Sequence, residues 1–140
     1  MGQSPSGLTA AGLRGPGRLL VSVYAVFALA ATARATVQLV RDAAEAPLAY
    51  GLSALAAVVY VVATVALART GSRSRAVAWA AVSVELIGVV TVGLASIIEP
   101  AAFPRATVWS GFGAGYGYVP LVLPVLGVLY LRRSGPGRSR

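Results

Sequence analysis

Four long apolar stretches separated by short polar segments set the pattern of this 140-residue chain. Each stretch reaches about 20 residues, the length that an α-helix needs to cross the hydrocarbon core of a bilayer. The stretches predict helices at 19–40, 47–68, 76–98 and 108–131. We therefore expect an all-α fold, a bundle of four transmembrane helices over residues 17–133. A disordered tail at 1–16 and a basic tail at 134–140 would flank it.

The segments between the stretches contain residues that begin or end helices. Pro47 suits the first turn of the second helix, and the basic turn RTGSRSR at 69–75 follows that helix. Pro100 and Pro104 prevent the third helix from continuing.

The first stretch also has features of a secretory signal. Basic residues precede it, and Ala31-Thr32-Ala33 is a candidate cleavage site. The apolar run continues beyond this site to Val40, which favours a retained helix, and the sequence leaves cleavage open.

The last stretch, TVWSGFGAGYGYVPLVLPVLGVLYL, has alternating glycines and two prolines one helical turn apart. On a helix the glycines would form two overlapping small-xxx-small pairs that allow close packing against another helix. They are Gly111, Gly113, Gly115 and Gly117. Pro120 and Pro124 lack backbone donors, so we expect the fourth helix to be kinked there. An ion-channel filter at 115–117 is disfavoured, because the residues after it would be too few to span the membrane.

The composition favours a membrane protein and excludes several kinds of catalytic and metal-binding site. Apolar residues make up 57% of the chain and charged residues 11%, against about 25% charged in soluble domains. The chain contains no Cys and no His, which removes disulfides, His-held haem and the common zinc and copper sites. It also removes Cys- and His-based nucleophile pairs. We expect no metal, no cofactor and no enzymatic activity.

Twelve basic residues, all arginine, give a net charge of +8 and lie mostly near the ends of the predicted helices. Nine fall on one side of the membrane: Arg14, Arg18, Arg69, Arg73, Arg75, Arg132, Arg133, Arg138 and Arg140. Three fall on the other: Arg34, Arg41 and Arg105. The positive-inside rule then predicts a multi-pass protein of the inner (plasma) membrane with both termini in the cytoplasm. This placement favours contact with lipid headgroups over nucleic-acid binding.

Glu85 is the acidic residue of the third predicted helix, about 14 Å from its cytoplasmic edge and close to the membrane centre. A carboxylate at that depth is costly, so it should face protein or water. Ala81 and Gly88 lie on its side of the helix and suit close packing. Two interpretations stay open: a relay for protons or cations, and a protonated or hydrogen-bonded carboxyl that holds helices together.

Arg34 lies near the outer end of the first helix, where it could snorkel to the surface or pair with Glu99 or Glu85. The expected kink lies close to Glu85 in depth. We therefore hypothesise one mid-membrane polar site formed by Glu85, Tyr116, Tyr118 and Arg34. Tyr24 and Tyr60 fall inside their helices and are predicted core residues.

The chain resembles uncharacterised small four-helix integral membrane proteins of high-GC bacteria. The residues that carry this resemblance are 107–110 (TVWS) and 112–127 (FGAGYGYVPLVLPVLG). The resemblance covers all four stretches and implies the architecture, but it brings no assigned activity.

Two function hypotheses follow from these residues. The first is a non-enzymatic scaffold or accessory subunit, which packs against itself as a homo-oligomer or joins a larger membrane complex. The second is a small proton-coupled transporter that uses Glu85. In size and number of spans the chain is similar to small multidrug exporters. Those carry their essential Glu in the first helix, whereas Glu85 is in the third.

Overall fold

The computed structural model describes residues 16–42, 44, 47–104 and 106–134. Its α-helices are α2 (Pro16–Asp42), α3 (Pro47–Ala68), α4 (Ser72–Ile98) and α5 (Val119–Arg133). Two 3₁₀ segments, η1 (Pro100–Ala102) and η2 (Ser110–Tyr116), connect α4 to α5. The predicted all-helical fold is confirmed for these residues. The predicted tails lie outside them, apart from Pro16 and Ser134.

Three helices, α2, α3 and α4, are each long and apolar enough to cross a membrane. The segment after α4 qualifies as a fourth span only if η2 and α5 count together, and these two are bent by 101°. With 15 residues, α5 is about 22 Å long, which is shorter than a hydrocarbon core of about 30 Å. The described residues therefore contain three candidate spans, or four if the bent pair is one span.

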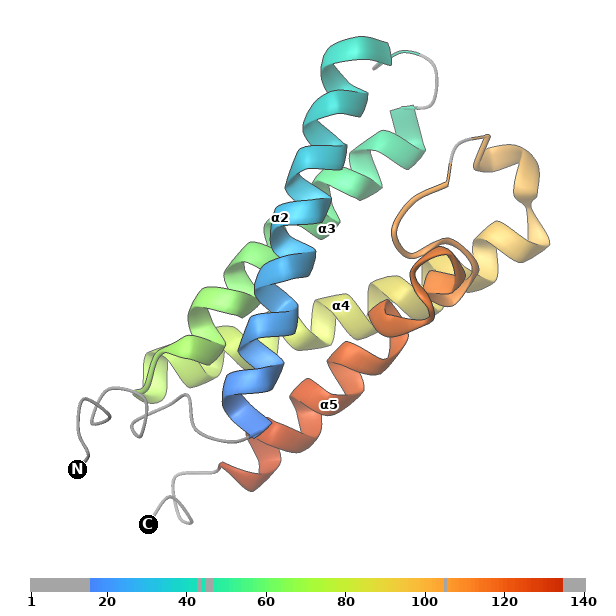
Figure 1. Ribbon diagram of the computed structural model, residues 1–140. Coiled ribbons are helices and arrows are strands. Elements are labelled where there is room, and N and C mark those ends of the chain that lie inside the picture. Colours follow the sequence, from blue (N-terminus) through green and yellow to red (C-terminus); the bar gives the residue numbers. More distant parts are fainter. Residues whose placement is uncertain (1–15, 43, 45–46, 105, 135–140) are drawn as a thin grey trace.

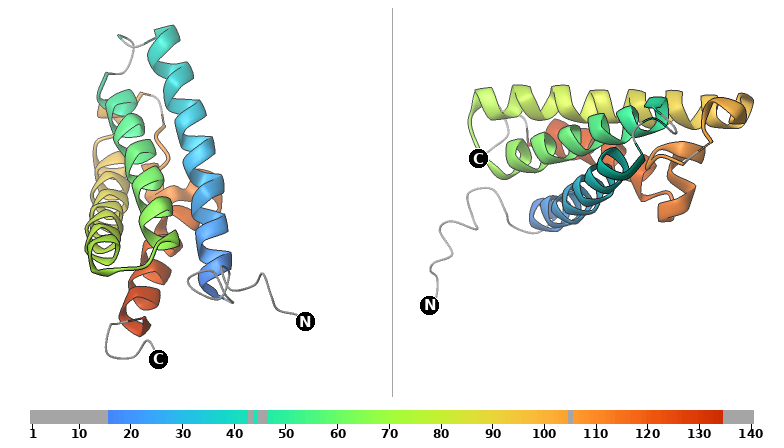
Figure 2. Two further views of the ribbon diagram at one scale, coloured as in Figure 1. Left: turned by 90° about the vertical axis from the view of Figure 1, so that its left-hand side faces the viewer. Right: turned by 90° about the horizontal axis from the view of Figure 1, so that it is seen from above.

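Figure 1 shows α2 and α3 side by side, with α4 and α5 packed against them. The start of α2, the turn between α3 and α4, and the end of α5 lie at one end of the molecule (Figures 1 and 2). The start of α2 packs closely against α5 at this end, because a Cβ on Gly17 would lie 2.8 Å from the ring of Tyr130.

The core is formed by small and aromatic side chains from all four helices. Tyr24, Tyr60 and Trp109 are among its largest fully buried side chains, which agrees with the prediction for both tyrosines. Large aliphatic residues such as Val26, Val58 and Ile87 point outward and are 59–65% exposed. An apolar exterior of this kind suits contact with lipid chains.

The fourth helix predicted over 108–131 is wrong in almost half of its length, because the helix begins at Val119. The segment before it turns through the left-handed region of φ and bends the chain. The residues with positive φ are Gly111, Phe112, Gly113, Gly117 and Tyr118. Glycine adopts such φ values without steric penalty, so the alternating glycines allow the chain to turn here. They therefore do not form the expected small-residue face of a helix.

Of the two prolines at which a kink was expected, only Pro124 lies in the interior of a helix, and a kink at Pro124 stays a prediction. Pro120 stands in the first turn of α5, where a missing N–H costs nothing. Its ring packs against Gly113, whose Cβ would lie 2.8 Å from Pro120 Cδ. Pro124 is a buried residue inside α5. The bend itself lies at Gly117 and Tyr118, between η2 and α5.

Two glycines of α4 receive aromatic rings from the segment that follows. A Cβ on Gly88 would lie 2.6 Å from the Trp109 ring, and one on Gly93 would lie 2.4 Å from the Phe112 ring. Ser96 adds a polar contact, since its hydroxyl accepts from the backbone N–H of Gly111 at 2.8 Å. Trp109 is only 1% exposed, so its ring packs inside the protein.

Candidate functional site

Glu85 lies in the interior of the bundle with no exposed surface. Its place on the buried face of α4 agrees with the expectation that it faces protein. The hydroxyl of Tyr24 donates a hydrogen bond of 2.7 Å to Glu85 Oε1 and so joins α2 to α4. Among the described residues, Glu85 Oε2 is buried and has no hydrogen-bond partner. The carboxyl group is therefore held by one oxygen and unpaired at the other.

Side chains from the other helices close around this pair. The rings of Tyr24 and Tyr60 have centroids 6.2 Å apart, and the Tyr60 hydroxyl accepts from Trp109 Nε1 at 3.2 Å. Gly127 of α5 lies over Tyr24, where a Cβ would be 3.3 Å from the tyrosine hydroxyl. Elements α2, α3, α4 and α5, together with the Trp109 segment, thus meet around one buried carboxyl group.

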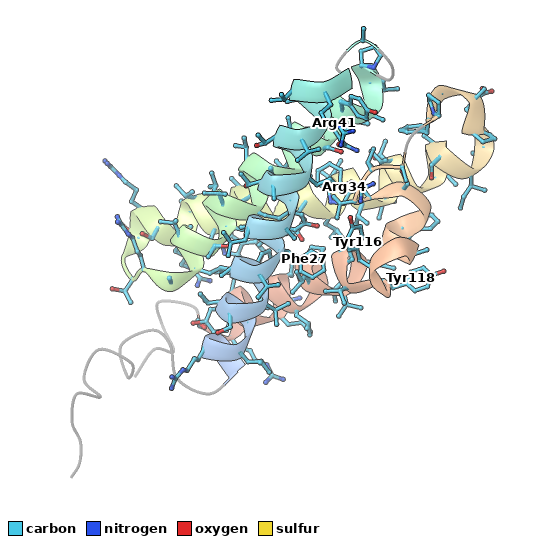
Figure 3. The ribbon with its side chains drawn as sticks, turned by 45° about the horizontal axis from the view of Figure 1, so that its top comes forward. Phe27, Arg34, Arg41, Tyr116 and Tyr118 are labelled. Atoms are coloured by element: carbon cyan, nitrogen blue, oxygen red, sulfur yellow. The ribbon has the colours of Figure 1, made fainter. Side chains whose placement is uncertain are left out.

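Arg34 forms a second polar cluster, nearer the C-terminal end of α2. Its guanidinium group donates to the hydroxyl of Tyr116 and, at 3.0 Å, to the backbone carbonyl of Ala106. It also lies over the Tyr116 ring, with Cζ 5.8 Å from the centroid. Figure 3 shows Arg34 and Tyr116 pointing toward each other across the space between α2 and η2. Both acceptors are uncharged, so the proposed pairing of Arg34 with Glu99 or Glu85 is wrong.

A small pocket opens beside Arg34 where α2, α3 and the segment before α5 meet. Its volume is about 10 Å³, close to the minimum that one water molecule needs. Its lining is Phe27, Ala30, Ala31, Arg34, Ser53, Val108 and Tyr116. The hydroxyl of Ser53 is buried there without a hydrogen-bond partner among the described residues. The pocket therefore combines one cation and one unpaired hydroxyl with apolar walls.

The two clusters are separate, so the predicted single site of four residues does not form. Arg34 bonds to Tyr116, whereas Glu85 bonds to Tyr24. Tyr118 is 51% exposed and points away from Arg34 in Figure 3. Its left-handed φ of 62° turns it outward at the bend.

A row of aromatic rings spans the gap between the clusters. Successive ring centroids are 5.9–6.2 Å apart in the order Tyr24, Tyr60, Phe27 and Tyr116. Phe27 has no hydroxyl group, so the row is not a continuous chain of proton-carrying groups. It packs the two clusters together without joining them by hydrogen bonds.

Arg75 is a residue whose role sequence reasoning missed. Its guanidinium group donates to the backbone carbonyl of Ser134 at 3.0 Å and to that of Leu131. It also lies 6.0 Å from the ring centroid of Trp79. A cation bonded to the last carbonyls of a helix satisfies unpaired acceptors and matches the helix dipole. No sequence signal links Arg75 to a helix end 56 residues away.

Within the described parts of the chain, no group of three or more His, Cys, Asp or Glu side chains lies close enough to hold a metal ion. The chain matches no protein-family profile, no curated protein sequence and no solved structure.

Proposed function

We propose that the chain crosses the plasma membrane four times, with both termini in the cytoplasm. Three long helices and the bent η2–α5 pair support this number of passages. The basic residues support the orientation, because the end of the molecule where α2 starts and α5 finishes has most of the described arginines. These are Arg18, Arg69, Arg73, Arg75, Arg132 and Arg133, whereas Arg34 and Arg41 lie toward the other end.

Protease access tests this orientation. The turn between α3 and α4 has exposed arginines at 69 and 73, so trypsin should cleave it wherever it is reachable. We expect protection in intact spheroplasts and cleavage after permeabilisation. Cleavage at this turn in intact cells would contradict the orientation.

We infer that the protein is a non-enzymatic membrane scaffold or accessory subunit. The observation that carries this proposal is that the buried polar side chains of the protein bond to one another across its helices. Glu85 bonds to Tyr24 and joins α4 to α2, and Trp109 bonds to Tyr60 of α3. Arg34 and Tyr116 join α2 to η2. Each of these pairs holds elements of the chain to one another, which is the role expected of a structural polar contact in a membrane bundle.

Two exposed glycines offer surfaces where another helix could approach closely. Gly51 on α3 and Gly115 in η2 are both exposed, and a Cβ on either would meet nothing within 4 Å. Neither has a positive φ. Small exposed residues are common where membrane helices contact each other. A larger side chain at these positions should therefore block a partner without disturbing this chain.

Purification from native membrane in mild detergent tests the scaffold proposal, with Gly51→Leu and Gly115→Leu as surface variants. We expect a stoichiometric assembly, of this chain alone or with a second protein, that at least one variant dissociates. Gly51→Ala and Gly115→Ala serve as matched controls and should keep the assembly. A monomer without stoichiometric companions would contradict the proposal. So would an assembly that both leucine variants leave unchanged.

A small proton-coupled transporter is the second candidate, and one observation favours it. Glu85 Oε2 has no partner among the described residues, although it lies about 20 Å along α4 and near mid-membrane. An unpaired carboxyl oxygen at that depth is the group that a proton relay needs. Proteoliposomes in a pH gradient test this candidate. Proton flux should be lost in Glu85→Gln, and flux that survives the substitution would rule out the relay.

A further inference from the structure

One face of α2 toward its outer end has cationic and amide groups among apolar neighbours. Gln38 lies four residues beyond Arg34, and Arg41 lies seven residues beyond it, so the three share a helix face. Figure 3 shows Arg34 and Arg41 on the side of α2 that faces α4 and η2. We call these three residues the outer α2 face.

The charge of Arg34 is not neutralised within the described residues. Its two acceptors are a tyrosine hydroxyl and a backbone carbonyl, and both are uncharged. An arginine within a span is costly unless an anion or water meets it. Asp42 and Glu45 follow Arg41 in the sequence, and their side chains lie outside the described part of the chain. The case for an anion therefore depends chiefly on Arg34.

Two buried polar atoms near this face have no hydrogen-bond partner among the described residues. They are Oε1 of Gln38 and Oγ of Ser53, and Ser53 is only 3% exposed. Ser53 lines the same pocket as Arg34. Buried polar atoms normally have a partner. The pocket beside Ser53 has room for about one water molecule, whereas Gln38 Oε1 on the outer α2 face is left for a polar ligand. The amide oxygen of Gln38 requires a hydrogen-bond donor from that ligand.

The depth of the outer α2 face matches the boundary between lipid chains and headgroups. With 27 residues, α2 is about 40 Å long, and a hydrocarbon core of about 30 Å would leave about 5 Å beyond it at each end. Gln38 then lies close to the outer boundary, with Arg34 about 8 Å inside the boundary and Arg41 about 3 Å outside it. Lipid phosphates lie at this level, and Ala30 and Val37 provide exposed apolar surface below and beside it.

We propose that the outer α2 face binds the headgroup of an anionic phospholipid from the outer leaflet. The phosphodiester lies between Arg34 and Arg41, and the Gln38 side chain turns outward so that a headgroup hydroxyl donates to its Oε1. A glycerol headgroup has both the single negative charge and the hydroxyl donors that this arrangement requires. A choline headgroup has the same phosphodiester but no donor and no net charge.

Native mass spectrometry of the full chain tests this site, with phosphatidylglycerol and phosphatidylcholine as the two lipid probes at equal concentration. The wild-type protein should retain phosphatidylglycerol in preference to phosphatidylcholine. Arg34→Gln should lower that retention about tenfold, since hydrogen bonds to charged groups contribute on this scale. Arg69→Gln removes the same charge from the exposed turn at the other end and should leave retention unchanged.

Further variants keep the test decisive if loss of the Tyr116 contact unfolds Arg34→Gln. Arg41→Gln and Gln38→Leu leave that contact intact, and each should lower retention about threefold. Equal retention of the two lipids by the wild type would overturn the proposal. So would equal loss in Arg34→Gln and Arg69→Gln, or normal retention in both Arg41→Gln and Gln38→Leu. Displacement of the lipid by an equal concentration of inorganic phosphate would overturn a lipid ligand in favour of a soluble anion.

Discussion

Helices α3 and α4 and the segment 107–133 are all apolar, but only the first two are continuous over their full predicted lengths. In α3 and α4, glycines are isolated, and two of those in α4 lie where aromatic rings approach. In 107–117, glycine stands at every second position from Gly111, and the backbone takes positive φ values. Apolar length therefore predicts membrane passage in both regions, whereas local glycine density decides whether the passage is one helix or a broken one.

The largest expected effect comes from comparing the two tryptophans. Trp109 fills the space over Gly88 and is 1% exposed, whereas Trp79 is half-buried on α4. Trp109→Ala should lower the free energy of unfolding by about 3–5 kcal/mol, because it leaves a large cavity and an unpaired Tyr60 hydroxyl. Unfolding by SDS titration in mixed micelles measures this. Trp79→Ala should cost clearly less, and an equal loss would contradict the docking of the 107–117 segment.

The buried hydrogen bond between α2 and α4 gives the next effect. Tyr24→Phe removes the donor to Glu85 Oε1 and leaves the carboxyl group with no partner among the described residues. We expect a loss of about 1–3 kcal/mol in the same titration, the cost of an unsatisfied buried polar group. Tyr118→Phe is the matched control, since that side chain is 51% exposed. A Tyr24→Phe protein as stable as the control would show that Glu85 is not held by Tyr24.

Arg75 and Arg73 allow a further comparison, at the end of the molecule where α4 begins and α5 ends. Arg75 bonds to the last carbonyls of α5, whereas Arg73, two residues before it on α4, is exposed. Arg75→Gln should cost about 1.5 kcal/mol through loss of a charged hydrogen bond. Arg73→Gln should cost close to nothing, as exposed charges usually do. Equal unfolding free energies for the two variants would exclude a capping role for Arg75.

The smallest expected effect depends on backbone conformation alone and comes from comparing a glycine of η2 with a glycine of the bend. Gly117 has φ 65° and open space around it, whereas Gly115 has the same open space without a positive φ. Gly117→Ala should therefore cost about 1 kcal/mol, the penalty for a side chain in the left-handed region. Gly115→Ala should be neutral or slightly stabilising. In a continuous helix both substitutions would stabilise the protein, so that result would contradict the bend.

Most of the helices could be predicted, because the length of each apolar stretch in the sequence directly indicates a helix. The predicted 47–68 coincides with α3, and the third and first predicted helices differ from α4 and α2 only at their ends. Pro47 and Pro100 mark boundaries by removing backbone donors, which is a local property of the sequence. Burial of Glu85 was predictable for a similar reason, since a carboxyl group on the lipid side is too costly.

The helix predicted over 108–131 fails in its first part because two local signals there are each compatible with two structures. Four alternating glycines can form a packing face on a helix, but the same residues also permit a turn. Pro120 can kink a helix, but proline is also favoured in the first turn of a helix. Together, a glycine run followed by Pro120 indicates a helix that starts near Val119. This signal was present in the sequence.

The partners of the polar residues could not be predicted, because they depend on how distant elements pack. Glu85 and Tyr24 are 61 residues apart, and Arg34 and Tyr116 are 82 apart. Depth in the membrane placed Glu85 and Tyr116 at similar levels. It does not give the direction in which each side chain points around its helix axis. That direction determines that two separate clusters form.

Backbone ¹³C chemical shifts of the protein in lipid bilayers test the bend between η2 and α5 most directly. Residues 119–133 should give helical shifts, and residues 111–118 should depart from them, with Phe112 and Tyr118 at values typical of positive φ. An unbroken series of helical shifts from 108 to 131 would contradict the bend at Gly117 and Tyr118 and the docking of Trp109 on α4.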